Sequence, residues 1–286
     1  MMPGAGTRLY GVIGFPLGHT LSPALHNAAF AATGHDGVYV ALPVAPARLA
    51  DAMAGVRALR IAGLSVTVPH KVAVVDLLDG LTPEARAAGA VNAVYREGER
   101  LLGHNTDIAG YQAMLAEAGQ EARRALVLGA GGAARAVCLA LRRAGIPFTV
   151  AARDTAKAAD LARALGAGGD GSVRAAIAWE DLGTLLPAID LLINTTPIGM
   201  HPAVAASPAP DLAALPAGAI VHDIVYRPRE TLLLAAARAR GLRTVEGGTM
   251  LVAQAAEAFE RWTGFPAPVA EMRAAFEQAT GDDQSC

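Results

Sequence analysis

A glycine-rich turn between two apolar segments is the feature that most constrains the fold of this chain. The short apolar run Ala125–Leu128 predicts a buried strand. It ends in Gly-Ala-Gly-Gly-Ala-Ala at Gly129–Ala134, and a helix-favouring segment, Ala133–Ala144, overlaps the end of the turn. A strand, a glycine turn and a helix start in the spacing G-x-G-x-x-A are typical of a dinucleotide-binding unit.

Each small residue of this turn has a physical task. Gly129 permits the tight turn, Gly131 lets the backbone approach a pyrophosphate, and Ala134 lets the helix pack closely on the strand. The free N–H groups at the helix N-terminus then face the anion. A chance match is the alternative in a chain with 31 glycines, but a second predicted strand, Phe148–Ala152, ends about where a ribose-reading residue is expected. The turn therefore predicts dinucleotide binding.

Length, charge and composition exclude several classes of protein. With 286 residues, 53% of them hydrophobic, the chain can form two domains with ample core. A net charge of −2 without a basic block argues against nucleic acid or a membrane surface as a partner. No apolar run approaches the ~20 residues of a membrane helix, and the N-terminus lacks a signal-peptide core. Two cysteines form no disulfide framework, which fits the cytoplasm, and the seven histidines show no metal-ligand spacing, so no metal is expected.

Before the glycine turn, polar residues follow the predicted strands. Leu9–Ile13 predicts a strand that leads into a loop with Thr20 and Ser22. Ser22 followed by Pro23 is a good helix start, because serine caps helices and proline suits the first helical position. The simple interpretation is a capped helix after a loop. The alternative is that two hydroxyls and a helix N-terminus together bind a carboxylate.

Lys71, Asn92 and Asp107 have the same kind of context. The predicted strand Ile61–Val68 is followed by a proline and Lys71, which places the lysine at the carboxyl edge of the sheet, where ligands bind in open α/β sheets. Asp107 precedes the predicted helix Ile108–Ala118, and Asn92 lies in the segment Gly89–Val94, which is predicted to form a hairpin with Arg100–Gly103. The simple interpretations are a solvated lysine, a turn residue and an N-cap.

Strands and helices alternate after the glycine turn. Further strands are predicted at Phe148–Ala152, Leu191–Asn194, Ile220–Asp223 and Arg243–Val245, and helices at Thr155–Leu165, Thr231–Arg240 and Thr249–Thr263. This alternation predicts an α/β fold with a parallel doubly wound sheet.

Seven stretches of the chain, in order, resemble the shikimate dehydrogenase family. They are GFPLGHTLSPALHN (Gly14–Asn27), VTVPHK (Val66–Lys71), GAVN (Gly89–Asn92), GHNTD (Gly103–Asp107), GAGGAAR (Gly129–Arg135), NTTPIGM (Asn194–Met200) and MLVAQA (Met250–Ala255). The resemblance implies an α/β substrate-binding catalytic domain over 1–110 and a NAD(P)-binding Rossmann domain over 111–246. It also implies a C-terminal helical segment, 247–286, that returns to the first domain.

The resemblance further implies reversible, NADP-dependent reduction of 3-dehydroshikimate to shikimate, a step of aromatic amino acid biosynthesis. Reducing a ring ketone leaves an alkoxide that needs a proton, and a lysine oriented by a carboxylate can exchange it; the implied pair is Lys71 and Asp107. The residues implied at the substrate carboxylate are Thr20, Ser22 and Tyr226, and those at the ring hydroxyls are Thr67, Asn92 and Gln254 together with the catalytic pair. The residues implied at the cofactor are Gly129, Ala130, Gly131, Gly132, Ala133, Arg153, Asp154, Lys157, Thr195 and Gly248.

Several residues depart from the family pattern and leave the substrate open. Thr20 stands where serine is usual, Ser65 where asparagine is usual, and Ala93 where threonine is usual. None of these changes removes the catalytic pair. Quinate or an amino analogue of shikimate therefore remains an alternative substrate, and the chain is expected to be a monomer or a homodimer.

The cofactor also has an alternative. Members of the family that use NADP typically read Asn-Arg-Thr after the second strand of the Rossmann domain, whereas this chain reads Ala152-Arg153-Asp154. Arg153 and Lys157 favour a 2′-phosphate, while Asp154 can accept from a 2′-hydroxyl and repel the phosphate. We expect NADP, with NAD as the alternative.

Two other classes of protein fit the sequence less well. A non-catalytic dinucleotide sensor is expected to lack Lys71 or Asp107, and both are present. A methyltransferase that uses the glycine turn for a nucleoside cofactor leaves the N-terminal motifs unexplained.

Overall fold

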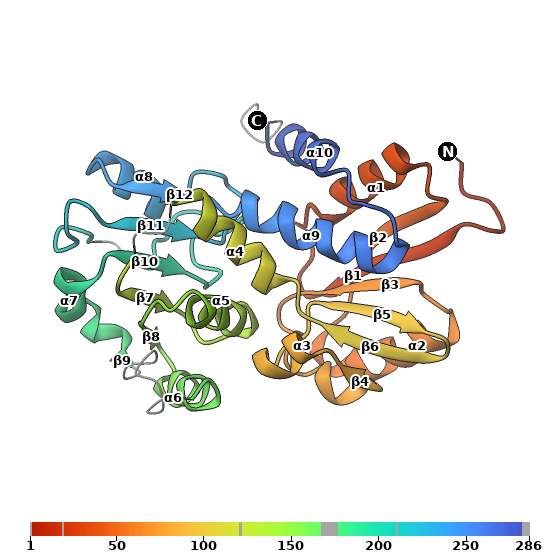
Figure 1. The fold of residues 1–286 in the computed structure, drawn as a ribbon, viewed down its shortest axis with the longest axis horizontal. Helices are drawn as coiled ribbons and strands as arrows, with labels where there is room; N and C mark the ends of the chain where they lie inside the picture. The colour runs from red at the N-terminus through yellow and green to blue at the C-terminus, as the bar shows by residue number, and fades with distance from the viewer. Residues whose placement is uncertain (1, 19, 120–121, 167–176, 210, 282–286) are drawn as a thin grey trace. The chain divides into compact units, whose positions relative to one another are not determined.

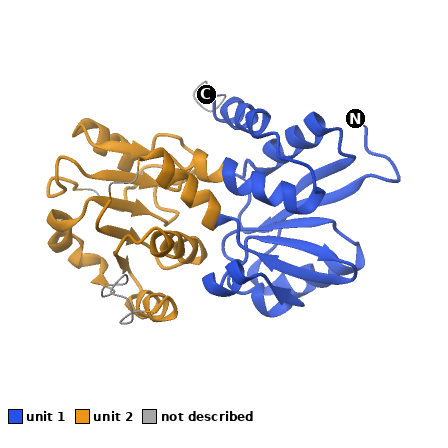
Figure 2. Ribbon diagram, in the orientation of Figure 1, with its two compact units in different colours: residues 1–107, 252–286 blue, residues 108–251 orange. Residues whose placement is uncertain are grey.

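The chain is divided into two compact units. The computed structural model describes residues 2–18, 20–119, 122–166, 177–209 and 211–281 (Figure 1). Unit 1 consists of residues 1–107 and 252–286, and unit 2 of residues 108–251 (Figure 2). Two helices, α4 (Asp107–Glu117) and α9 (Gly248–Thr263), run across the divisions between the units.

Unit 1 contains a mixed six-stranded sheet in the order β2-β1-β3-β5-β6-β4. The strands are β1 (Arg8–Gly14), β2 (Gly37–Pro43), β3 (Gly63–Val66), β4 (Gly80–Leu81), β5 (Ala93–Glu97) and β6 (Arg100–His104). β1 pairs in parallel with β2 and β3, whereas β5 is antiparallel to β3 and β6. Because β1 and β3 are parallel neighbours, the loops that follow them leave the same edge of the sheet.

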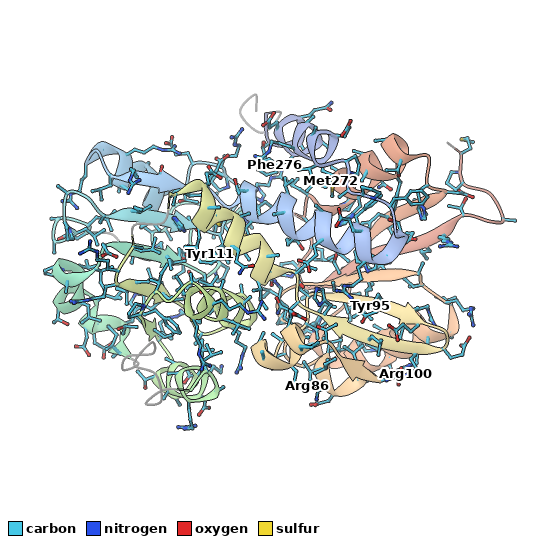
Figure 3. All side chains as sticks on the ribbon, viewed as in Figure 1. Arg86, Tyr95, Arg100, Tyr111, Met272 and Phe276 are labelled. Carbon is cyan, nitrogen blue, oxygen red and sulfur yellow. The ribbon has the colours of Figure 1, made fainter. Side chains whose placement is uncertain are left out.

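The helices of unit 1 come from both ends of the chain. They are α1 (Ser22–Thr33), α2 (Leu49–Ala58), α3 (Pro83–Ala88), α10 (Val269–Gly281) and the part of α9 from residue 252 onward. α10 packs on α1, and its side chains Met272 and Phe276 are buried (Figure 3). Trp262 of α9 lies against Gly63, where a Cβ would come within 2.6 Å of the indole, and its Nε1 donates to the Val94 carbonyl at 3.0 Å. The predicted return of the C-terminal helices to the first domain is confirmed.

The start of α1 corrects one prediction. Ser22 is not the N-cap: it is the first helical residue, and Leu21 occupies the cap position without a side-chain cap bond. The hydroxyl of Thr20, two residues earlier, accepts from the Ser22 backbone N–H at 3.4 Å. The serine–proline pair predicted the helix start to within one residue, because proline at the first turn requires no N–H partner.

Unit 2 contains a parallel six-stranded sheet in the order β12-β11-β10-β7-β8-β9. The strands are β7 (Ala125–Leu128), β8 (Phe148–Ala152), β9 (Ile177–Ala178), β10 (Leu191–Asn194), β11 (Ile220–Asp223) and β12 (Arg243–Val245). In chain order this is the doubly wound Rossmann arrangement, whose strand order reverses between β7 and β10. The predicted fold class is confirmed.

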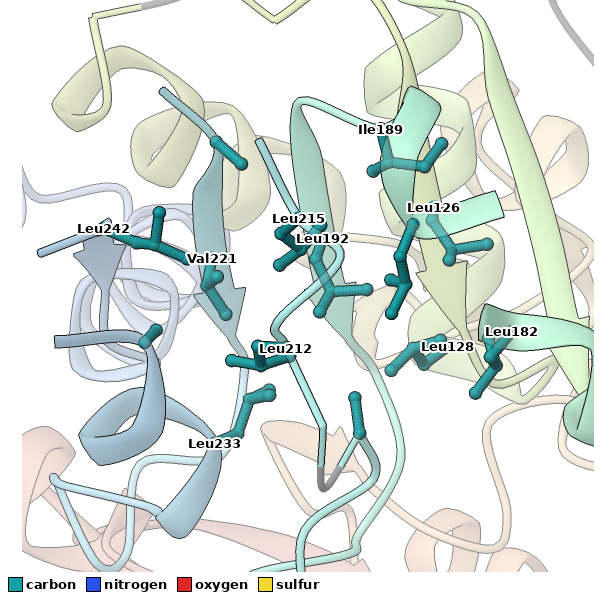
Figure 4. Packing of buried hydrophobic residues seen from close by; sticks show 14 of the residues in the cluster. Leu126, Leu128, Leu182, Ile189, Leu192, Leu212, Leu215, Val221, Leu233 and Leu242 are labelled. Atoms are coloured by element: carbon teal, nitrogen blue, oxygen red, sulfur yellow. The ribbon is translucent and has the colours of Figure 1, made fainter. Parts of the chain in front are cut away.

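The helices of unit 2 cover this sheet around a leucine-rich core. They are α4, α5 (Gly132–Arg143), α6 (Thr155–Ala164), α7 (Leu182–Leu185) and α8 (Leu232–Ala239). Leu126, Leu192 and Val221 of neighbouring strands pack with Leu233 of α8 (Figure 4). No helix of the described residues combines the length and the apolar character that a membrane span requires.

Candidate active site

Lys71 and Asp107 form a buried ion pair in unit 1. Lys71 Nζ lies 2.6 Å from Asp107 Oδ2, and the two side chains are only 12% and 5% exposed. Lys71 lies in the turn that follows β3, and Asp107 is the first residue of α4. The Asp107 carboxylate bonds to Lys71 and Asn92, and no bond from it to the α4 backbone is found among the described residues. The Lys71 ammonium group and its proton are therefore held away from bulk water.

Asn92 connects this pair to the residue before α4 and to α9. Its Nδ2 donates to Asp107 Oδ1 and Thr106 Oγ1, each at 2.9 Å, and approaches Gln254 Oε1 at 3.3 Å. Its Oδ1 accepts from the Thr106 backbone N–H at 2.7 Å. Gln254 comes from α9, so a residue 162 positions away along the chain joins the network. Lys71, Asp107, Asn92 and Gln254, which the sequence predicted as site residues, are thus brought together.

The polar residues after β1 and before α1 form a second part of the same sheet edge. Thr20 Oγ1 and Ser22 Oγ lie 3.4 Å apart at the start of α1. Thr67 follows β3, and its backbone N–H donates to the Ile13 carbonyl at 2.9 Å. Gly14 is essential to this arrangement, because a Cβ there would collide with the Thr67 methyl group. Two hydroxyls at a helix N-terminus can bind a carboxylate.

Sequence reasoning assigned no role to Thr106 and Gly14, although both lie inside stretches that carried the family resemblance. Thr106 is fully buried and donates toward Gln254 Oε1 at 3.5 Å. Thr106 could have been predicted as a site residue from its position in the GHNTD stretch, directly before Asp107. Gly14 could have been predicted because it is a glycine at the end of a predicted strand.

The glycine turn in unit 2 has the geometry of an anion site. Gly129 has φ +110°, a conformation that favours glycine, and a Cβ there would lie 2.7 Å from Thr195 Oγ1. Thr195 in turn donates to the Leu128 carbonyl at 2.7 Å. At Gly131, directly before α5, a Cβ would meet no atom within 4 Å, and no side chain caps the helix. The start of α5 thus lacks a side-chain cap and has open space beside Gly131, at the point where the strand order reverses.

Arg153, Asp154 and Lys157 lie beyond the end of β8. Asp154 is the N-cap of α6: it accepts from the Lys157 backbone N–H at 3.1 Å and lies 3.3 Å from Lys157 Nζ. These bonds, the backbone one first, lower the pKa of Asp154. Arg153 is exposed, and its side chain has no hydrogen bond or ion pair among the described residues. The Asp154 carboxylate is thus engaged by its own helix, while the Arg153 guanidinium is available to an anion.

Asp223 organises the loops that follow β10 and β11 in unit 2. It is fully buried and accepts from Asn194 Nδ2 at 2.9 Å, Thr231 Oγ1 at 2.7 Å and the Val225 backbone N–H at 3.0 Å. Burial raises the pKa of Asp223 to about 6. Tyr226 follows in the β11 loop and is partly buried.

Gly248 begins α9 on the unit 2 side of the division, next to the β11 loop. A Cβ on its neighbour Gly247 would collide with the carbonyl oxygen of Ile224, so only glycine allows the two backbones to approach this closely. The sequence predicts Glu246-Gly247-Gly248 as a hinge before the last long helix; the close approach of the two backbones at Gly247 was not predicted.

Cys138 is buried in α5, and burial raises the pKa of its thiol, so it behaves as a small core residue. Within the described part of the chain, no group of three or more histidine, cysteine or acidic side chains is arranged to hold a metal ion.

Two segments of the chain match known protein domains. Residues 12–94 match the shikimate dehydrogenase substrate binding domain, and residues 247–275 match the shikimate 5'-dehydrogenase C-terminal domain. Over 278 residues the chain is 47% identical to the shikimate dehydrogenase (NADP(+)) of Symbiobacterium thermophilum, covering 94% of this chain and 93% of the relative. It is 46% identical to the enzyme of the same name from Moorella thermoacetica, covering 97% and 95%.

Solved structures agree with these relatives. A shikimate dehydrogenase in complex with NADP+ superposes with a TM-score of 0.90 at 36% identity, covering 98% of both chains. The shikimate 5-dehydrogenase of Thermus thermophilus with NADP(H) and shikimate gives 0.84 at 36% identity, covering 96% and 100%. Quinate dehydrogenase from Corynebacterium glutamicum with NAD gives 0.86 at 34% identity, covering 95% and 99%. The chain therefore belongs to the shikimate dehydrogenase family.

Proposed function

We propose that this chain catalyses the reversible NADP-dependent reduction of 3-dehydroshikimate to shikimate. The observation that carries the proposal is the buried Lys71–Asp107 pair, 2.6 Å apart and joined to Asn92 at the sheet edge of unit 1. Residues 1–110 are proposed to bind the substrate, 111–246 the dinucleotide, and 247–286 to complete the first domain.

Substrate binding is assigned to the polar groups around the pair. Thr20 and Ser22, at the start of α1, are proposed to bind the ring carboxylate with help from Tyr226. Thr67, Asn92 and Gln254, with the pair itself, are proposed to bind the ring hydroxyls. Amides and hydroxyls suit this task because each offers both donors and acceptors.

Lys71 is proposed to move the proton. In the direction of reduction, its ammonium donates a proton to the oxygen of the ring carbonyl; in the direction of oxidation, its amine accepts the proton of the ring hydroxyl. Asp107 Oδ2 fixes the position of Nζ, and Asn92 fixes Asp107 through Oδ1. The low exposure of both side chains limits proton exchange with bulk water.

The residues of unit 2 fit an NADP molecule. Open space at Gly131, the positive φ of Gly129 and the uncapped start of α5 suit a pyrophosphate, with Ala130, Gly132 and Ala133 in the same turn. Thr195 and Gly248 are proposed as further contacts, and Arg153 and Lys157 as partners of the 2′-phosphate. When bound, the cofactor supplies the hydride.

A second candidate is a quinate or aminoshikimate dehydrogenase that uses NAD. Asp154 favours it, since a carboxylate at this position can accept from a ribose hydroxyl and repel a phosphate. The Asp154 carboxylate already accepts from the Lys157 N–H and pairs with Lys157 Nζ, which reduces this effect, so we retain NADP as the first choice.

The proposal is tested by initial rates with shikimate and quinate, each with NADP+ and NAD+, followed by the nicotinamide absorbance. We expect the highest kcat/KM for shikimate with NADP+. A higher value for quinate with NAD+ would support the second candidate, and the absence of turnover in all four combinations would refute shikimate and quinate as substrates.

The proposed setting of the protein follows from the same properties. A small acid as substrate, a net charge of −2 and the lack of a basic block suit a cytoplasmic enzyme with no nucleic-acid or membrane partner, acting as a monomer or a homodimer.

A further inference from the structure

His104 connects three elements of unit 1 beside the proposed site. It is the last residue of β6, and its side chain is only 2% exposed. Its Nε2 lies 2.7 Å from Glu257 Oε1 on α9, and its Nδ1 lies 2.9 Å from Thr82 Oγ1. Thr82 is the N-cap of α3 and accepts from the Ala85 backbone N–H. The imidazole therefore ties α9 to β6 and to the start of α3.

Glu257 and Gln254 lie on the same face of α9. Side chains three residues apart on a helix are neighbours, so whatever fixes the rotation of α9 at Glu257 also fixes it at Gln254. The contacts of Gln254 Oε1 with Asn92 Nδ2 and Thr106 Oγ1 are long, at 3.3 and 3.5 Å. Both contacts depend on where α9 places the Gln254 side chain, so they depend on how α9 is held next to it.

His104, the partner of Glu257, is hydrogen-bonded through its backbone to Asn92. The His104 carbonyl accepts from the Asn92 N–H at 3.1 Å, and His104 is paired with Ala93 in the β5–β6 ladder. The short hydrogen bond between His104 Nε2 and Glu257 Oε1 therefore fixes α9 next to β6. This sets the position of Gln254 relative to Asn92.

Stability alone does not explain this pair. The second carboxylate oxygen of Glu257, Oε2, is buried and has no hydrogen-bond partner among the described residues. A buried polar atom without a partner costs free energy. A residue with such a cost beside a site residue is typical of a functional constraint.

We propose that His104 and Glu257 are positioning residues that hold Gln254 against Asn92 and thereby set the affinity for the ring hydroxyls of shikimate. This role rests on the proposed function of the site. The pair touches no reacting atom, so it acts on substrate binding and leaves proton transfer by Lys71 unchanged.

The first test is the replacement Glu257→Ala. We expect the KM for shikimate to rise about three- to tenfold, in the lower part of the range of coupling between residues of one network, with kcat changed less than about twofold. Titration calorimetry with shikimate alone, in the absence of cofactor, is expected to show the same loss of affinity. Glu257→Gln keeps the acceptor Oε1 and is expected to recover most of it. Glu260→Ala is the matched control, because Glu260 is on the same helix but bonds only to the Ala267 N–H among the described residues.

A double-mutant cycle with Gln254→Ala decides whether Glu257 acts through Gln254. In that background, Glu257→Ala is expected to cause no further loss of affinity. His104→Phe keeps an aromatic ring without its hydrogen bonds, and it tests the tie from the strand side if an α9 variant unfolds. The proposal is overturned if Glu257→Ala causes the same loss of shikimate affinity in the Gln254→Ala background as in wild type. It is also overturned if wild type binds shikimate and Glu257→Ala binds it with the same affinity. A wild-type protein that neither binds nor oxidises shikimate would instead refute the proposed function, and this role with it.

Discussion

Replacing Lys71 with methionine removes the ammonium group and its proton but keeps the length of the side chain. If Lys71 exchanges the proton, kcat is expected to fall by ~10²–10⁴, the usual contribution of a general acid or base. That loss corresponds to a rise of ~3–5 kcal/mol in the activation barrier. The KM for shikimate is expected to change much less than kcat, because Lys71 is only one of the groups proposed at the ring hydroxyls and Thr20, Ser22, Asn92 and Gln254 are untouched.

The buried position of the pair predicts a second, separable effect on stability. Asp107 is 5% exposed and loses its cation in Lys71→Met. Removing one partner of a buried pair costs ~3–5 kcal/mol; we expect the lower end, since Asn92 still donates to Oδ1 at 2.9 Å. Adding Asp107→Asn removes the stranded charge. The double variant is therefore expected to be more stable than Lys71→Met alone and equally inactive.

Initial rates of shikimate oxidation and urea unfolding of the same preparations measure the two effects separately. Arg48→Met is the control for loss of a cation in unit 1, because Arg48 forms only an exposed ion pair with Asp51 among the described residues. Near-wild-type kcat in Lys71→Met would refute Lys71 as the proton donor. If the double variant Lys71→Met, Asp107→Asn is less stable than Lys71→Met alone, Asp107 is not an unpaired buried charge in the single variant, and the reasoning is wrong.

Three further predictions follow from the structure. Arg153→Ala is expected to raise the KM for NADP+ about tenfold or more, since a charge-assisted bond contributes ~1.5–3 kcal/mol, with NAD+ kinetics nearly unchanged; equal losses with both cofactors would contradict the assignment. Ser22→Ala is expected to weaken shikimate binding, and removing the ligand carboxylate should then matter less than in wild type; fully additive losses in calorimetry would mean that Ser22 does not contact the carboxylate. The pKa of Asp223, raised from 3.8 to about 6 by burial, means that the folded state holds this proton more tightly than the unfolded state. The wild-type free energy of unfolding should therefore fall relative to Asp223→Asn as the pH rises from 4 to 7, by up to about 3 kcal/mol. Urea unfolding at several pH values checks this, and a rise of wild type relative to the variant would refute it.

The fold could be predicted in large part because its signals are local. The turn at Gly129–Ala134 and the alternation of apolar strands with helices predicted the Rossmann sheet, and the edge strand Arg243–Val245 was found where expected. Helix starts were less certain. Ser22 was predicted as an N-cap and is the first helical residue. Serine is accepted both at the cap and in the first turn, so the sequence pattern leaves the helix start uncertain by one position.

The sequence by itself determined which chemistry is available: a lysine and an aspartate at the ends of predicted elements, and a glycine turn for a dinucleotide. Only the tertiary structure decided which groups meet. Gln254 reaches Asn92 across 162 positions, and Glu257 reaches His104 across 153, because α9 packs its tryptophan against Gly63 of the first sheet. Short-range spacing encodes turns and helix starts through backbone sterics and hydrogen bonds. Contacts between residues far apart depend instead on how apolar faces pack, which no short stretch of sequence specifies.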